Sequence, residues 1–216
     1  MAHTSIRLPR IPPVVPTIWP QPFNDSTGVF EPKYDGFRGM VYLSAGGGCT
    51  IYSKRGNRFS RFPELEKRLC SAFPRRDLVL DGEIVAFDDD GRVSFWDLMH
   101  GEGILGYVAF DLLWYRGRDL RTLPLLERNK RLTRLIPEQD GTLCSVLVIE
   151  EHGQELFEAV CGSDLEGIVA KRGADAYNLR TRWLKIKNPT YSQAQRRREL
   201  FDRWGSRDEP QTIASG

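Results

Sequence analysis

Apolar and polar positions alternate over short stretches of the chain, as they do in β-strands with one buried face. The first two stretches, residues 39–44 and Cys49–Ser53, flank Ala45-Gly46-Gly47-Gly48 and predict a hairpin. Strand-like character begins at Val29. Further strands are predicted at residues 78–80, 84–87, 107–114, 145–149, 168–171 and 183–187.

Helical spacing of apolar residues occurs in three segments, 63–73, 125–136 and 153–161. A basic amphipathic helix is predicted at 193–204. Because the strands come in pairs and the helices are inserted irregularly, the pattern favours an α+β fold with antiparallel sheets over a doubly wound α/β fold.

The beginning of the chain shows no periodicity and is rich in proline, at positions 9, 12, 13, 16, 20 and 22. Proline is poorly compatible with a helix interior or a central strand. We therefore expect an extended lead-in over residues 1–28 that lies along the domain surface. A folded domain over residues 29–189 and a basic tail over residues 190–216 would follow.

Composition is that of a globular protein, because 40% of the 216 residues are hydrophobic and 28% are charged. The net charge of +2 does not by itself indicate a nucleic-acid binder. Basic residues are concentrated between Arg180 and Arg198, so any nucleic-acid surface must be local.

The four cysteines have no CxxC spacing, which argues against zinc and favours free thiols in a reducing compartment. No apolar run reaches the roughly 18 residues that a membrane span needs. The beginning of the chain has no signal-peptide pattern. We therefore expect a cytoplasmic protein without a membrane partner.

The first stretch with candidate chemistry is residues 31–38, which contains Lys33 followed by an Asp35-Gly36 turn and Arg38. A lysine amine is a nucleophile when it is uncharged, and burial and nearby cations favour that form. The turn would present the lysine, and Arg38 would bind phosphate. On these residues alone, a surface lysine beside an ordinary turn is an equally good interpretation.

Two further stretches lie in the middle of the chain. A carboxylate of Asp81-Gly82-Glu83 would bind a ribose hydroxyl or a metal ion, although a hairpin turn with solvated acids has the same pattern. Phe110, on an apolar strand, would stack on a purine base. Core packing of Phe110 is the better interpretation when this residue is taken alone.

The last two stretches are residues 166–172 and 183–187. The first of these stretches is apolar in its middle and charged at both ends. The carboxylate of Glu166 would suit a divalent metal, and the ammonium of Lys171 would suit a phosphate. Alternation places Lys185 and Lys187 on one strand face, where they would form an anion site. The plain alternatives are the solvated ends of a half-buried strand and the polar face of an amphipathic one.

Taken in this order, the five stretches resemble the motifs of the covalent nucleotidyltransferase superfamily of DNA ligases, RNA ligases and mRNA capping enzymes. The finer similarity is to bacterial ATP-dependent DNA ligases of the non-homologous-end-joining kind and their stand-alone relatives. It rests on residues 30–33, 61–65, 108–113 and 187–189.

The resemblance implies a nucleotidyltransferase fold and the reaction of an ATP-dependent DNA ligase. Lys33 would attack the α-phosphate of ATP and expel pyrophosphate. The AMP would move to a DNA 5′-phosphate, and the 3′-hydroxyl would displace it and close the strand. The implied partner is nicked or broken duplex DNA.

The resemblance also implies roles for single residues around the nucleotide. Glu31 would face the adenine edge and Phe110 would stack on the ring. Arg38 would contact ribose or phosphate, and Glu83 would hold a ribose hydroxyl.

Other implied roles concern the metal ion and the phosphates. Glu166, together with Glu83, would bind Mg²⁺ or Mn²⁺. Three lysines would surround the phosphates and keep the Lys33 amine uncharged: Lys171, Lys185 and Lys187.

The chain departs from the family pattern at the residues expected to touch the DNA. Related ligases usually read Ser-Arg-Asn-Gly where this chain has Ser53-Lys54-Arg55-Gly56. Either Lys54 or Arg55 would take the arginine's place at the terminal phosphate, and the choice stays open.

A second departure follows Lys187, after which 29 residues remain. A five-stranded OB-fold domain, which related ligases have here, does not fit in that length. We therefore expect weak self-adenylation, with better sealing of a pre-adenylated nick, unless a partner protein or separate OB domain contributes. The basic tail would cover a DNA backbone, or would equally well be a solvated helix face.

Two other functions compete with the DNA ligase. An RNA ligase or a capping guanylyltransferase shares the motifs, and the latter would require GTP. A degenerate domain would bind nucleic acid without catalysis.

Overall fold

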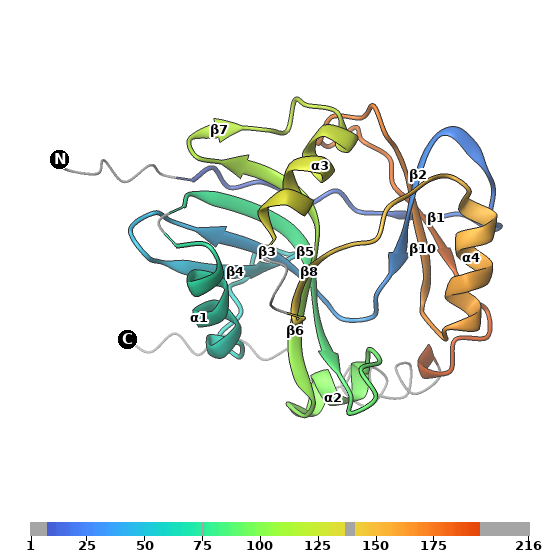
Figure 1. Ribbon diagram of the computed structural model, residues 1–216, viewed down its shortest axis with the longest axis horizontal. Helices are drawn as coiled ribbons and strands as arrows, with labels where there is room; N and C mark the ends of the chain where they lie inside the picture. Colours follow the sequence, from blue (N-terminus) through green and yellow to red (C-terminus); the bar gives the residue numbers. More distant parts are fainter. Residues whose placement is uncertain (1–7, 75, 137–140, 195–216) are drawn as a thin grey trace.

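The computed structural model describes residues 8–74, 76–136 and 141–194. In this part of the chain, two β-sheets are flanked by four helices (Figure 1). The first sheet has the strand order β1 (Thr17–Ile18), β11 (Leu184–Lys187), β10 (Gly167–Arg172), β2 (Asp25–Lys33) and β9 (Ile149–Glu151).

The second sheet has the order β4 (Cys49–Ser53), β3 (Phe37–Leu43), β5 (Leu78–Phe87), β6 (Ile104–Tyr115) and β7 (Arg118–Asp119). A short strand, β8 (Leu143–Ser145), pairs with β6. The helices are α1 (Pro63–Ala72), α2 (Phe95–His100), α3 (Leu125–Leu135) and α4 (Gly153–Gly162). Most strand pairs are antiparallel, so the predicted α+β class is confirmed.

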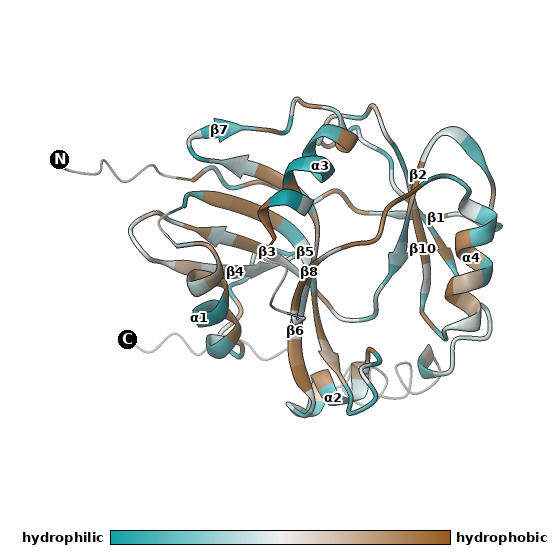
Figure 2. Cartoon of the chain, in the orientation of Figure 1, coloured by the Kyte–Doolittle hydropathy of each residue, from teal (hydrophilic) through white to brown (hydrophobic). Residues whose placement is uncertain are grey.

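The first sheet buries its outer face under α4, which lies along it at the right of Figure 1. Phe30, Ile168 and Ile186 pack there against Leu156 and Val160 of the helix. Strand β10 is largely brown in Figure 2, consistent with its burial. Because side chains alternate between faces, the residues between these apolar ones point to the opposite, inner face.

The second sheet has an apolar cluster on each face. One face packs against the helices through Leu65 of α1, Leu98 of α2 and Leu132 of α3. On the other face, Met40 and Leu113 pack with side chains from outside the second sheet: Ile11, Val14, Tyr177 and Trp183. The second cluster therefore joins the two sheets.

The lead-in is less superficial than the sequence predicts. Ile11 and Val14 are buried, and their backbone amides donate to the hydroxyls of Tyr42 and Tyr177 at 3.0 and 3.1 Å. Strand β1 then adds to the edge of the first sheet beside β11. Apolar residues between the prolines thus enter the core, which a pattern without periodicity does not reveal.

The helices predicted at 63–73, 125–136 and 153–161 are confirmed as α1, α3 and α4, and the 39–53 hairpin is confirmed as β3 and β4. The strand predicted at 145–149 is wrong, because residues 143–145 pair with the second sheet and 149–151 with the first. The chain crosses from one sheet to the other between them. Asp81-Gly82-Glu83 lies inside one continuous strand, β5, and not between two strands.

Most of the predicted 193–204 helix and of the 190–216 tail lies outside the described residues. The four cysteines are free thiols. None of the described helices is long and apolar enough to cross a membrane.

Candidate functional site

The inner face of the first sheet carries rows of charged side chains. Lys33 on β2 and Lys187 on β11 both pair with Gly167 of the strand between them. Val169 lies two residues further along the middle strand, β10. It pairs with Glu31 on β2 and with Lys185 on β11. These four side chains therefore share one face, opposite the apolar residues that pack on α4.

Lys33 ends β2 and lies beside an acidic residue from the segment before β10. Its Nζ is 2.5 Å from Oε2 of Glu166, whose Oε1 is 3.7 Å from Nζ of Lys187. The Glu166 side chain is 6% exposed and that of Lys33 is 21% exposed, so the pair is largely screened from bulk water but open on the side of the lysine. The structure thus brings together three residues that are far apart in the sequence.

Two glycines allow the backbone to approach this pair closely. Gly167 has φ +145°, and a Cβ there would lie 2.1 Å from the carbonyl oxygen of Ile186. A Cβ on Gly36 would lie 2.1 Å from the carbonyl oxygen of Ile84, in the second sheet. Any side chain at these positions would push apart the strands that hold Lys33 and the turn after it.

On the second sheet, Arg38 is fixed by Asp81. Two hydrogen bonds of 2.6 Å join the guanidinium to the two carboxylate oxygens, and Tyr177 donates to the same carboxylate at 2.6 Å. Asp81 is fully buried. Within the predicted Asp81-Gly82-Glu83 motif, the first carboxylate therefore orients Arg38.

Phe110 reaches the site because β6 contains a bulge. Asp81 pairs with Asp111 while the next residue, Gly82, pairs with Ala109, so Phe110 is the extra residue. A bulge re-aims the side chain that it carries. The ring centroid of Phe110 lies 4.7 Å from the Arg38 guanidinium and 4.9 Å from the Lys171 ammonium.

Lys171 is paired with Glu31 and is buried. Its Nζ lies 2.5 Å from Oε2 of Glu31 and 4.0 Å from the ring centroid of Trp183. Burial raises the pKa of Glu31, and the charge of Lys171 opposes that effect. Lys171 pairs with Val29 on β2, four residues before Lys33, which is about 13 Å along a strand.

The acids and cations of the site influence one another. Burial raises the pKa of Glu83 to about 7, against the charges of Lys33 and Arg38, while Glu166 and Asp35 raise it further. Burial also lowers the pKa of Lys185, and the charges of Lys33, Lys187 and Lys54 lower it further. Lys54, on the turn after β4, thus lies within electrostatic range of the lysines on the first sheet. Arg55 beside it is exposed.

The carboxylates fit a metal ion that arrives with a nucleotide. Among the described residues, no group of three or more His, Cys, Asp or Glu side chains is arranged to hold a metal. Mg²⁺ is usually bound by one or two carboxylates plus phosphate and water oxygens. Glu83 and Glu166, the two acids that the sequence predicts for the metal, influence each other's charge in this site, and two carboxylates are enough for a metal that brings its own phosphate ligands.

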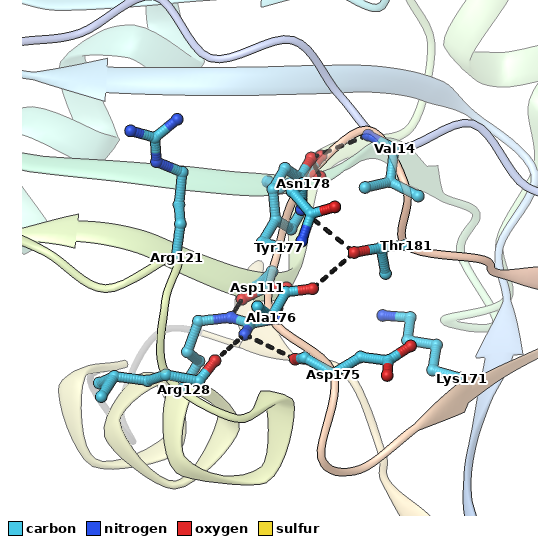
Figure 3. Close-up of polar contacts among 12 residues, drawn as sticks. Val14, Asp111, Arg121, Arg128, Lys171, Asp175, Ala176, Tyr177, Asn178 and Thr181 are labelled. Atoms are coloured by element: carbon cyan, nitrogen blue, oxygen red, sulfur yellow. Dashed lines mark hydrogen bonds and ion pairs between the residues drawn. The ribbon is translucent and has the colours of Figure 1, made fainter.

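Sequence reasoning missed the loop that carries Tyr177 (Figure 3). Arg128 of α3 forms hydrogen bonds of 2.7 and 2.9 Å with buried Asp111 and donates at 3.0 Å to the carbonyl of Asp175. Thr181 donates to the carbonyl of Ala176 at 2.6 Å. These bonds fix the loop that aims Tyr177 at Asp81, and no local sequence pattern announces contacts between residues so far apart.

Comparison with known proteins places the chain in a family. A family model for the ATP dependent DNA ligase domain matches residues 20–187. The multifunctional non-homologous end joining protein LigD of Pseudomonas aeruginosa is 36% identical over 168 residues, covering 73% of this chain and 20% of that protein. The bifunctional LigD of Bacillus subtilis is 32% identical over 192 residues, covering 74% and 31%.

The chain therefore spans about a fifth to a third of the length of these relatives. A solved structure of mycobacterial DNA ligase D, complexed with ATP and MES, matches with a TM-score of 0.71 at 27% identity, covering 81% of this chain and 59% of that one. The fold is thus the nucleotidyltransferase fold of DNA ligases. The chain belongs to the ATP-dependent DNA ligase domain family and is related to the ligase domains of bacterial LigD proteins.

Proposed function

We propose that this chain is a DNA ligase catalytic domain that attaches AMP to Lys33, transfers it to a DNA 5′-phosphate and seals the nick. The observation that carries the proposal is the pairing of Lys33 with Glu166 on the charged face of the first sheet. Membership of the ligase family supports the reaction class, and this pair supports Lys33 as the nucleophile.

In the first step, Lys33 Nζ bonds to the α-phosphorus of ATP and the bond to pyrophosphate breaks. The amine must lose a proton, and the 2.5 Å separation from Glu166 Oε2 supports that carboxylate as the acceptor. The AMP then passes to the DNA 5′-phosphate, which frees Lys33. Finally the 3′-hydroxyl attacks that phosphate and AMP leaves.

The nucleoside would lie beside Phe110, with Glu31 at the adenine edge. The Glu31–Lys171 ion pair supports a place for Lys171 near the base and not among the phosphates. Arg38, held by Asp81, would contact the ribose or the α-phosphate, and Glu83 would hold a ribose hydroxyl.

The phosphates would meet the lysine row of Lys185 and Lys187. Lys54 would contact the DNA phosphate: its side chain is exposed, and its charge adds to the cationic face that contains Lys185. Bound Mg²⁺, held by Glu83 and Glu166, would neutralise phosphate charge. Preorganised cations are an effective way to stabilise phosphoryl transfer.

The test is the sealing of a nicked DNA duplex by wild type and by Lys33→Ala, with ordinary and with pre-adenylated 5′ ends. Wild type should seal both, the ordinary nick with ATP and more slowly than the pre-adenylated one, whereas Lys33→Ala should seal only the pre-adenylated nick. Lys67→Ala, on the exposed side of α1, is the control and should match wild type. Nick binding without sealing of either substrate would point to a binding module. Preference for GTP or for an RNA nick would point to the other branches of the superfamily.

A further inference from the structure

Residues 188–193, which we call the strap, run from the end of β11 across the site. Their contacts are made with three separate parts of the fold. Asn188 is buried, and its backbone amide donates to the carbonyl of Glu166 at 2.9 Å. Its side-chain amide donates to the carbonyl of Leu165 at 3.0 Å. The strap therefore begins by fixing the backbone that carries Glu166.

The middle of the strap contacts the turn after Lys33. Tyr191 is 7% exposed, and its hydroxyl donates to Oδ2 of Asp35 at 3.3 Å. Burial raises the pKa of this hydroxyl well above its ordinary value, as do the charges of Asp35 and Glu166, so it stays a neutral donor. The phenol therefore lies against the turn that follows Lys33.

The end of the strap is anchored to the segment before Glu166 and to the start of α2. Ser192 donates its backbone amide to Asp164 at 2.9 Å. Gln193 accepts from the amide of Phe95 at 2.9 Å and donates to the carbonyl of Val93 at 3.0 Å, at the start of α2. With both ends fixed, the Tyr191 hydroxyl has a defined position relative to Asp35.

We propose that the strap is a positioning device for the nucleophile, in which Tyr191 holds the Asp35 turn and Asn188 holds Glu166, so that Lys33 keeps one orientation. The inference rests on the proposed function, because it deepens the account of the Lys33 site. Tyr191 acts through Asp35 and is a positioning residue.

Tyr191→Phe is the direct test, because it removes the hydroxyl and keeps the ring. Loss of one hydrogen bond to a charged acceptor should lower the rate of Lys33 adenylation at saturating ATP about tenfold. The KM for ATP should change less than about twofold, because no nucleotide contact is removed. Tyr42→Phe, which loses a buried hydroxyl contact to Ile11, is the matched control and should adenylate as wild type does.

A second readout needs no nucleotide. An amine-acylating reagent reacts slowly with an ammonium held by a carboxylate, so Tyr191→Phe should make Lys33 react about threefold faster, as measured by peptide mass spectrometry. Lys171 is buried, so its acylation would become faster only if the whole fold loosened, and we expect its rate to stay the same. Gln193→Ala releases the far end of the strap and should also make Lys33 acylation faster.

Faster acylation of Lys33 together with slower adenylation in Tyr191→Phe would support the strap. Unchanged Lys33 acylation, or equal acceleration at Lys171, would overturn it. A wild-type protein that gains no AMP would contradict the proposed function, while the acylation result would still decide on the strap.

Discussion

Glu83 carries a carboxyl group close to two cations and two other acids, and burial is the largest influence on its pKa. Its pKa of about 7 means that the folded protein binds this proton more tightly than the unfolded chain does. The contribution to stability is therefore fully present below the ordinary carboxyl pKa and is lost as pH rises through about 7.

Glu83→Gln removes this titration while keeping the shape of the side chain. In metal-free buffer, the free energy of unfolding of wild type should fall relative to the variant between pH 4.5 and pH 8. The upper limit of that change is about 3 kcal/mol. Urea unfolding at several pH values measures it, and a constant difference across the range would contradict the assignment.

Arg128 is a residue that supports the site from outside it. Its guanidinium is paired with Asp111, and both side chains are almost fully buried. Arg128→Ala should cost about 3–5 kcal/mol, because Asp111 would be left as an uncompensated buried charge. Lys130→Ala, on the exposed side of the same helix, is the control for helix effects. Thermal unfolding checks both, and equal stability of the two variants would show that the pair contributes little.

At the scale of elements, alternation along a strand predicted one part of the site, the lysine pair on the last strand, whereas the other site residues were predicted from short motifs and their resemblance to a family. Alternation placed Lys185 and Lys187 on one face, and their positions two residues apart on β11 confirm this arrangement. The three long helices also followed from apolar spacing. The bulge at Phe110 was not predictable, because two residues opposing one is a property of the β5–β6 pair and not of either strand alone.

Phe110→Leu keeps an apolar side chain at the bulge but removes the aromatic face. If a purine stacks there, the KM for ATP in adenylation should rise about fivefold, with a smaller change in the maximal rate. Phe59→Leu, in the aromatic cluster on the other face of the second sheet, is the control. An unchanged KM would assign Phe110 to packing, which is the interpretation that the isolated residue favoured.

The turn after β4 belongs to the second sheet but carries Lys54, whose charge lowers the pKa of Lys185 on the first sheet. The sequence left Lys54 and Arg55 as alternatives, and both side chains are exposed. We propose Lys54 for the phosphate contact, because its charge adds to that of Lys185 on the first sheet. Lys54→Ala should remove one phosphate contact from the complex with nicked DNA. The slope of log K against log salt should then become less steep by roughly 0.9. Arg55→Ala should change the slope less. The reverse order would assign the phosphate contact to Arg55.

At the scale of the molecule, the site lies where two sheets meet. Lys33 ends β2 of the first sheet, and Glu166 directly precedes β10 of the same sheet. The second sheet contributes Arg38, Glu83 and Phe110. The segments that join the sheets are the lead-in, the Tyr177 loop and the strap. These are the parts that sequence reasoning described least well, because their contacts cross long separations and follow no period. Charged residues on regular strands were predictable, whereas the residues that orient them were not.

Every role proposed for the site depends on Lys33 being the residue that receives AMP. Intact mass after incubation with ATP and Mg²⁺, followed by peptide mapping, tests it in wild type and in Lys33→Ala. We expect the gain of one AMP in wild type, mapped to Lys33, and no gain in the variant. A gain that persists in Lys33→Ala, or a wild-type protein that binds ATP and never gains AMP, would contradict it.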